Sequence, residues 1–144
     1  MVEARDVAKV LGGPSVLGRR VRGFADLAVA VKEGLPTVAM RALAALTQTS
    51  SKEISESVRI PPRTLMRLQK RERLPADESD KLYRLAHVIA TARKVFQDDK
   101  KAQGWLREPN AALGGATPLS LLDSEPGARQ VETILGRIAY GEIS

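Results

Sequence analysis

A run of cationic side chains near the middle of the chain is its most distinctive chemical feature. Residues 59–73 hold six cations against one acid, Glu72; the cations are Arg59, Arg63, Arg67, Lys70, Arg71 and Arg73. Such side chains bind phosphate oxygens, and arginine can also read guanine bidentately in the major groove of DNA. Because an isolated charge run is commonly no more than a solvated face, its meaning depends on the scaffold that presents it.

The apolar residues around this run have the spacing of a helix-turn-helix motif, in which two short helices are locked so that the second can enter the major groove. We predict helical segments over residues 50–58 and 61–73. The side chains at the locking positions are Ile54, Ser55, Val58, Ile60, Leu65 and Leu68. Arg59 stands where the turn usually has glycine, and a side chain there is less comfortable if the turn needs a positive φ.

Helical periodicity then predicts which side chains of the second segment face outward. With Leu65 and Leu68 turned inward, the predicted DNA-binding residues are Arg63, Thr64, Arg67, Lys70, Arg71 and Arg73. Arginines on the helix suit guanine, while Thr64 and the two arginines of the basic tail suit phosphates. The alternative is a helical hairpin with a merely soluble basic face, and binding that weakens steeply with salt would distinguish the two.

Composition limits the other kinds of chemistry. The 144 residues include no cysteine and a single histidine, His87. This excludes disulfides and thiol nucleophiles, and it leaves almost nothing for His-paired metal sites or serine–histidine relays. His87 itself is interpreted as a partly buried structural residue. We therefore expect a protein that is not an enzyme and that needs no cofactor and no metal.

Hydropathy gives an expectation for location. No apolar run approaches the roughly 18 residues of a membrane span, and the N-terminal residues carry mixed charge without the apolar core of a signal peptide. We therefore expect a cytoplasmic protein with no membrane partner.

The net charge of +6 is unevenly distributed along the chain. Residues 1–100 contain 19 Lys and Arg against 12 Asp and Glu, whereas residues 101–144 contain 4 against 5. The basic excess therefore lies in the first two-thirds of the chain, and this contrast suggests two surfaces with different tasks.

The periodic segments have helical spacing, which predicts an all-α fold. Helices are expected over residues 3–11 and 24–33, and another opens at Pro36. The longest helix is expected to take Asp77 as its N-cap, because a carboxylate there can accept from the free N–H groups of the first turn.

The C-terminal part begins with a long loop over residues 107–118. A last helix is predicted to be capped by Ser124 and ended by Gly141. Gly136 inside this helix lowers its stability, and close approach of another element would explain it. The chain is thus divided into an N-terminal helical segment, a helix-turn-helix region, a long connecting helix and a C-terminal domain, over residues 1–35, 36–74, 75–104 and 105–144.

Three stretches of the C-terminal part form a long and specific pattern. They are Trp105-Leu106-x-x-Pro109-Asn110-x-x-Leu113-Gly114-Gly115-x-Thr117-Pro118-Leu119-x-Leu121-Leu122, Glu125-x-Gly127-Ala128-x-x-Val131, and Leu135-Gly136-Arg137-Ile138-x-Tyr140-Gly141. This pattern closely resembles the toxin-binding region of the Xre/MbcA/ParS family of antitoxins. Arg63-Thr64-Leu65 and the stretch from Leu74 to Leu82 resemble the family's Xre-type helix-turn-helix region, so that the resemblance covers roughly residues 36–141.

The resemblance implies an Xre-like helix-turn-helix domain followed by a small helical toxin-binding domain. It implies a type II antitoxin that is encoded beside a RES-domain toxin. Toxins of this kind consume NAD, and the antitoxin's C-terminal part blocks their NAD-binding cleft. The resemblance further implies repression of the operon through operator DNA, usually by a homodimer. The toxin-binding residues that it implies are Trp105, Asn110, Leu113, Gly114, Gly115, Glu125, Arg129, Arg137, Tyr140 and Gly141.

Two alternatives stay open at this point. The apolar stripe of the last helix, which comprises Val131, Ile134, Leu135 and Ile138, is more readily explained as core than as interface. Trp105 likewise fits a role in packing the loop better than a direct contact. The second alternative concerns function, because a helix-turn-helix protein can also be a stand-alone transcriptional repressor.

Overall fold

The computed structural model describes residues 2–141, and within this range the regular secondary structure is helical apart from one isolated bridge between Pro36 and Arg73. The α-helices are α1 Ala4–Val10, α2 Gly13–Leu17, α3 Phe24–Glu33, α4 Val38–Leu46, α5 Ser51–Ser57, α6 Pro62–Leu68, α7 Ala76–Phe96, α8 Asp99–Arg107 and α9 Glu125–Ala139. Two 3-10 helices, η1 Ala111–Leu113 and η2 Pro118–Leu121, lie between α8 and α9. The predicted all-α fold is confirmed.

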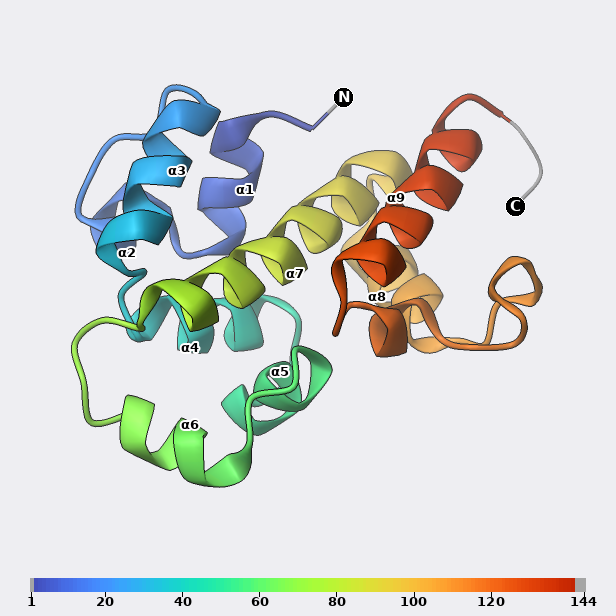
Figure 1. The fold of residues 1–144 in the computed structure, drawn as a ribbon. Coiled ribbons are helices and arrows are strands. Elements are labelled where there is room, and N and C mark those ends of the chain that lie inside the picture. Colours follow the sequence, from blue (N-terminus) through green and yellow to red (C-terminus); the bar gives the residue numbers. More distant parts are fainter. Residues whose placement is uncertain (1, 142–144) are drawn as a thin grey trace.

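Helix α7 is the central element of the fold. It crosses the molecule diagonally, with α1–α3 above it, α4–α6 below, and α8 and α9 at its far end (Figure 1). Helices α1, α3, α8 and α9 all pack against it. Its side chains Leu82, Leu85, Val88 and Ile89 are buried in one continuous apolar cluster that draws on every region of the described chain.

The longest helix begins earlier than predicted. The N-cap position belongs to Pro75, and Asp77 lies in the first turn, so the expected cap was wrong. Proline suits this place because its fixed φ leads directly into a helix whose first N–H groups have no partner. Asp77 still lies where the helix dipole favours a negative charge.

The second helix of the helix-turn-helix is shorter than the predicted 61–73, because α6 ends at Leu68. The chain beyond it turns back to pair with the segment between α3 and α4. The N–H of Thr37 donates to the carbonyl of Glu72 at 2.9 Å, and the N–H of Leu74 donates to that of Leu35 at 2.8 Å. These hydrogen bonds join residues far apart in sequence. They satisfy backbone N–H and C=O groups that would otherwise have bonded within a longer helix.

Two helices were not predicted from the sequence. Pro14 lies in the first turn of α2, where its missing N–H costs nothing. Asp98 caps α8 by accepting from the N–H of Lys101. The predicted cap Ser124 and stop Gly141 of the last helix are confirmed, because Ser124 accepts from Gly127 and Gly141 takes a φ of 79° directly after the cap residue.

The glycine that another element approaches is Gly127, not Gly136. A Cβ on Gly136 would meet nothing within 4 Å, so the predicted close approach at that residue was wrong. A Cβ on Gly127 would stand 2.0 Å from the carbonyl oxygen of Leu121, which excludes any larger residue without movement of the backbone. The chain between η2 and α9 therefore folds back tightly onto the first turn of α9.

Within residues 2–141, every helix is too short or too polar to span a lipid bilayer. Nor do three or more His, Asp or Glu side chains gather as metal ligands in that range.

Candidate DNA-binding and partner-binding surfaces

Helices α5 and α6 form the predicted helix-turn-helix. The side chains at the locking positions are all buried: Ile54, Ser55, Val58, Ile60, Leu65 and Leu68. The Ser50 hydroxyl caps α5 by accepting from the N–H of Glu53 at 3.2 Å. Pro61 and Pro62 begin α6, where the missing N–H groups cost nothing. Sequence spacing therefore identified this motif correctly.

The turn of the motif places Arg59 in the left-handed region with a φ of 58°. The turn therefore does need a positive φ, which is strained for arginine and would be unstrained for the glycine that usually occupies this position. Arg59 nevertheless makes a contact that glycine could not, because its Nε lies 2.9 Å from Oδ2 of Asp123. Asp123 lies directly before the cap of α9 in the C-terminal part, so this ion pair joins the turn to the other half of the protein.

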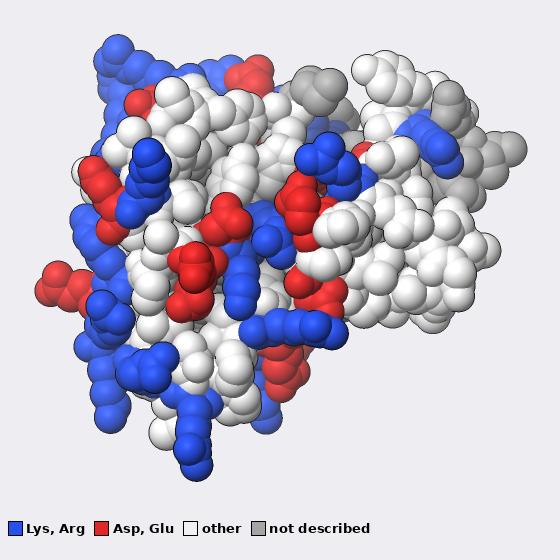
Figure 2. Space-filling model, viewed as in Figure 1, with Lys and Arg blue, Asp and Glu red and all other residues white. Residues whose placement is uncertain are grey.

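The outer face of α6 carries the predicted DNA-binding side chains. Arg63 and Arg67 are exposed on the helix, and the exposed Lys70 and Arg71 extend the group beyond its end, whereas Thr64 is half-buried. Within residues 2–141, none of these four cations forms an ion pair, so their charge is available to a partner. Figure 2 shows Lys and Arg along the left and lower edges of the molecule, from the region of α2 and α3 at the upper left down to α6 and the chain that follows it.

Arg73 differs from the other predicted DNA-binding residues. Its guanidinium donates to the carbonyl of Gly34 at 2.9 Å, beside the bridge between Pro36 and Arg73. This contact holds the side chain against its own protein. The structure therefore brings Arg63, Arg67 and the two cations that follow α6 together, and it places the Arg73 head group elsewhere.

Three of the predicted partner-binding residues, one in α8 and two in the loop after it, make contacts within the protein. Trp105 is half-buried, and its ring packs on Phe96 with the centroids 5.9 Å apart. Leu113 is buried in the core. Asn110 uses its side chain to accept from the N–H of Ala112 at 2.9 Å. Trp105 therefore packs against the end of α7, and its predicted role in packing the loop stays a prediction.

Two glycines form the exposed tip of this loop. Gly114 and Gly115 have φ values of 67° and 88°, which a side chain rarely adopts. The N–H of Gly115 donates to the carbonyl of Asn110 at 2.9 Å and closes the turn. The glycines therefore determine the shape of the tip rather than contribute groups to it.

Helix α9 has a buried apolar stripe along one side and an exposed C-terminal end. Val131, Ile134 and Leu135 are buried and Ile138 packs against the core, which confirms the core interpretation of this stripe. By contrast, Arg137, Tyr140 and Gly141 are exposed, and 81% of Tyr140 is accessible. The other two predicted residues are at the opposite end of the helix.

Those two residues, Glu125 and Arg129, belong to a network of ion pairs between α7 and α9. Arg129 lies 3.2 Å from Glu125, and Arg84 of α7 approaches Glu125 at 3.8 Å and Asp80 at 3.7 Å. A hollow of about 210 Å³ lies among these side chains and His87. The charged side chains at this end of α9 therefore have partners within the protein, while Glu125 and Arg129 themselves remain exposed.

His87 has the structural role that was predicted for it. Its Nδ1 pairs with the carboxylate of Glu132 on α9, and its ring lies about equally far from Phe24 and Tyr83, with centroids 6.0 and 5.9 Å away. Burial, together with the negative charges of Glu132 and Asp80, raises the pKa of Tyr83. This cluster joins α3, α7 and α9, and it has no second histidine with which to relay a proton.

Comparison with known proteins matches each half of the chain to a domain of known antitoxins. Residues 26–87 match the Antitoxin Xre-like helix-turn-helix domain, and residues 91–141 match the Antitoxin Xre/MbcA/ParS C-terminal toxin-binding domain. An Antitoxin Xre of Photorhabdus laumondii is 30% identical over 145 residues, which cover 99% of this chain and 94% of that protein. The chain belongs to the Xre/MbcA/ParS antitoxin family.

Two further relatives show how the likeness is distributed. An Antitoxin Xre of Pseudomonas putida is 43% identical over 83 residues, which span 57% of this chain and about half, 52%, of that protein. A protein of Sphingobium named Prs ADP-ribosylating antitoxin is 22% identical over 121 residues, which cover 77% of this chain and 76% of its own. All three of these relatives are named as antitoxins.

The two family matches meet within α7. The helix-turn-helix match ends at residue 87 and the toxin-binding match begins at residue 91, so one continuous helix of this antitoxin serves both. The sequence predicted both surfaces and named only polar side chains on α6. Met66 was not among them, although its spacing from Arg63 places it on the same side of the helix.

Proposed function

We propose that this antitoxin neutralises a RES-domain toxin that degrades NAD, by placing its C-terminal region in the toxin's active-site cleft. We further propose that it acts in the cytoplasm as a homodimer within a toxin–antitoxin complex, and that its helix-turn-helix represses its own operon. The observation that carries the proposal is the family match of residues 91–141 to a toxin-binding domain.

The end of α9 supports the first part of this proposal. Arg137 and Tyr140 are exposed there, beyond the stripe that anchors the helix in the core. In Figure 1 this end of α9 points away from the helix-turn-helix. Tyrosine and arginine are enriched among the residues that contribute most to protein interfaces. A side chain that fills a cleft excludes substrate without any chemistry of its own.

The outer face of α6 supports the second part. Arg63, Arg67 and Lys70 lie on an exposed face with no internal ion pairs among the described residues, on a motif whose second helix enters the major groove. Cations of this kind attract the phosphate backbone. The same chain can therefore hold DNA and toxin on different surfaces.

Rescue of growth tests the proposal. The antitoxin is expressed together with the toxin encoded beside it, and we expect rescue by the natural protein and by Arg63→Ala/Arg67→Ala. Arg137→Ala/Tyr140→Ala should lose rescue because its interface anchors are gone, with toxin affinity reduced about thirtyfold or more. Binding to the DNA upstream of the gene should show the opposite pattern.

Both variants alter exposed side chains, so circular dichroism should show that they fold. Removal of α9 would be a poor test, because it would also remove Val131 and Leu135 from the core. Failure of the natural protein to rescue growth, with DNA binding intact, would favour a stand-alone repressor. Loss of both activities in both variants would contradict separate surfaces.

A further inference from the structure

Met66 is unusual among the exposed apolar side chains of the protein. Within residues 2–141, five large apolar side chains are exposed: Phe24, Val29, Val38, Met66 and Tyr140. Met66 at 65% and Tyr140 at 81% are the most exposed of them. Tyr140 lies on the proposed toxin-binding surface, and Met66 lies on the proposed DNA-binding surface. Single exposed apolar residues are common, so the position of Met66 decides its meaning.

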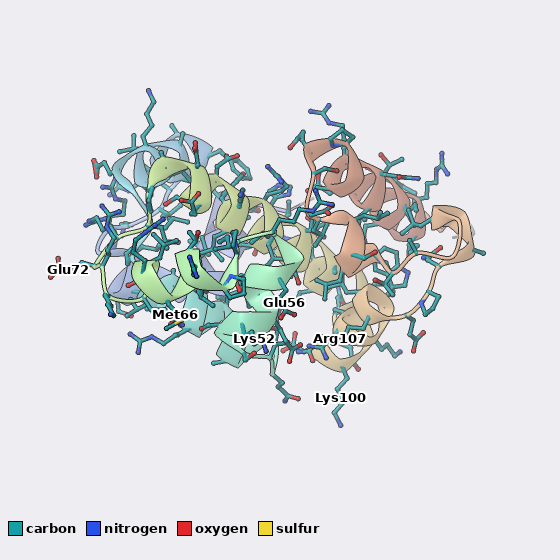
Figure 3. All side chains as sticks on the ribbon, turned by 60° about the horizontal axis from the view of Figure 1, so that its bottom comes forward. Lys52, Glu56, Met66, Glu72, Lys100 and Arg107 are labelled. Carbon is teal, nitrogen blue, oxygen red and sulfur yellow. The ribbon has the colours of Figure 1, made fainter. Side chains whose placement is uncertain are left out.

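That position is the middle of the cationic face of α6. Arg63, Met66 and Arg67 have the spacing i, i+3 and i+4 within α6, which puts them on one side of the helix, and Lys70 follows in the turn after its end. Leu65 and Leu68 are buried on the other side. In Figure 3, Met66 lies on α6 at the left of the view, and Lys100 and Arg107 of α8 lie at the right. The apolar side chain therefore stands among the groups proposed to contact DNA.

The chemistry of a thioether excludes a role at the phosphates. It has no charge and no N–H or O–H donor, so a phosphate oxygen gains nothing from it. The floor of the major groove offers one apolar group, the C5-methyl of thymine, which apolar side chains contact. Methionine suits it, because the side chain is unbranched, flexible and polarizable.

We propose that Met66 contacts the C5-methyl group of a thymine in the major groove and so helps to select the operator sequence. This inference rests on the proposed DNA binding. In this arrangement Arg63, Arg67 and Lys70 hold the helix in the groove and read guanine where it is present. Met66 supplies discrimination that charge cannot supply, since only thymine carries a methyl group there.

Replacement of thymine by deoxyuridine tests the contact, because it removes the methyl group and leaves base pairing intact. The probe is a duplex from the DNA upstream of the antitoxin gene, trimmed to the footprint of the protein. Each thymine is replaced singly, and affinity is measured by fluorescence anisotropy. We expect one or two positions at which the natural protein loses about fourfold in affinity, as for one methyl group no longer buried.

Met66→Ala and Met66→Gln should bind the unmodified duplex more weakly and should show no loss at those same positions. The matched control is Gln69→Ala, an exposed residue one position beyond α6, which should keep the full sensitivity to deoxyuridine. Arg63→Ala should weaken binding to the thymine and deoxyuridine duplexes by the same factor, because it retains Met66.

The outcomes separate this inference from the proposed function. If the natural protein binds the upstream duplex but no thymine position is sensitive, or if both Met66 variants keep the sensitivity, the methyl contact is refuted and DNA binding stands. If the natural protein binds no upstream DNA even at low salt, the proposed repression fails and the contact fails with it. A loss of sensitivity confined to the Met66 variants supports the contact.

Discussion

The outer face of α6 and the end of α9 are built in the same way and differ in charge. Each is a helix whose buried side is anchored in the common core, and each exposes one large apolar side chain, Met66 or Tyr140. Around Met66 stand cations without internal partners among the described residues, whereas residues 101–144 contain one more acid than base. Figure 2 shows this difference, with the C-terminal side of the molecule almost free of blue.

The comparison indicates two physical modes of recognition. Unpaired cations attract a phosphate backbone over distance and release its counterions. A surface with few charges and an exposed aromatic anchor depends mainly on shape and on burial of apolar area. The net charge of +6 therefore describes neither surface, because it averages over both.

The largest expected contrast is in salt dependence. If Arg63, Arg67, Lys70 and Arg71 each neutralise one phosphate, the slope of log affinity against log salt is about −3.6, or roughly a hundredfold between 50 and 200 mM. Toxin binding should change by less than about threefold over the same range, since few exposed charges contribute. Titrations of the same preparation with DNA and with toxin measure both. Equal slopes would remove the distinction between the surfaces.

The second contrast is between two glycines of α9. Gly127→Ala should lower the free energy of unfolding by about 2–3 kcal/mol, because its Cβ would collide with the carbonyl of Leu121. Gly136→Ala meets nothing within 4 Å and should raise it by up to about 1 kcal/mol. Urea unfolding followed by circular dichroism gives both values. Similar effects of the two substitutions would contradict the tight turn before α9.

Loss of a helix cap should affect the two surfaces selectively. Ser50→Ala removes the cap of α5, and Ser124→Ala removes the cap of α9. Each should lower the free energy of unfolding by about 1 kcal/mol. We expect Ser50→Ala to weaken DNA binding more than toxin binding, and Ser124→Ala to do the reverse. Affinities are measured at a temperature where both variants remain folded, so that a general loss of folded protein is excluded. Identical profiles would mean that the surfaces respond as one unit.

The smallest effect is expected at the ion pair between the two regions. Arg59 and Asp123 are close, but the Arg59 side chain is largely exposed, so a double-mutant cycle with Asp123→Asn should give a coupling below about 1 kcal/mol. Arg59→Gly loses this pair and relieves the left-handed strain at the turn, so its net change in stability should also be small. A coupling above about 2 kcal/mol would show that the two regions are joined more tightly than this exposed contact allows.

Much of the architecture could be predicted because it depends on local chemistry. The caps at Ser124 and Gly141 and the helical segment at 24–33 follow from residue type and neighbours in sequence. Asp98 is also a local signal, and α8 could have been predicted from it as a capped helix. The end of α6 could not, because it depends on backbone bonds to residues 35–37.

The all-α class, the helix-turn-helix spacing, the uneven charge and the family pattern can all be read from the sequence, because each depends on residue types at short separations. Which of these residues stay exposed and unpaired depends instead on how the helices pack. The tertiary structure turned Arg73 toward Gly34, brought Arg84 of α7 to Glu125 of α9, and left Met66 and Tyr140 exposed. The physical reason is that exposure and pairing depend on contacts between segments brought together only when α7 organises the core.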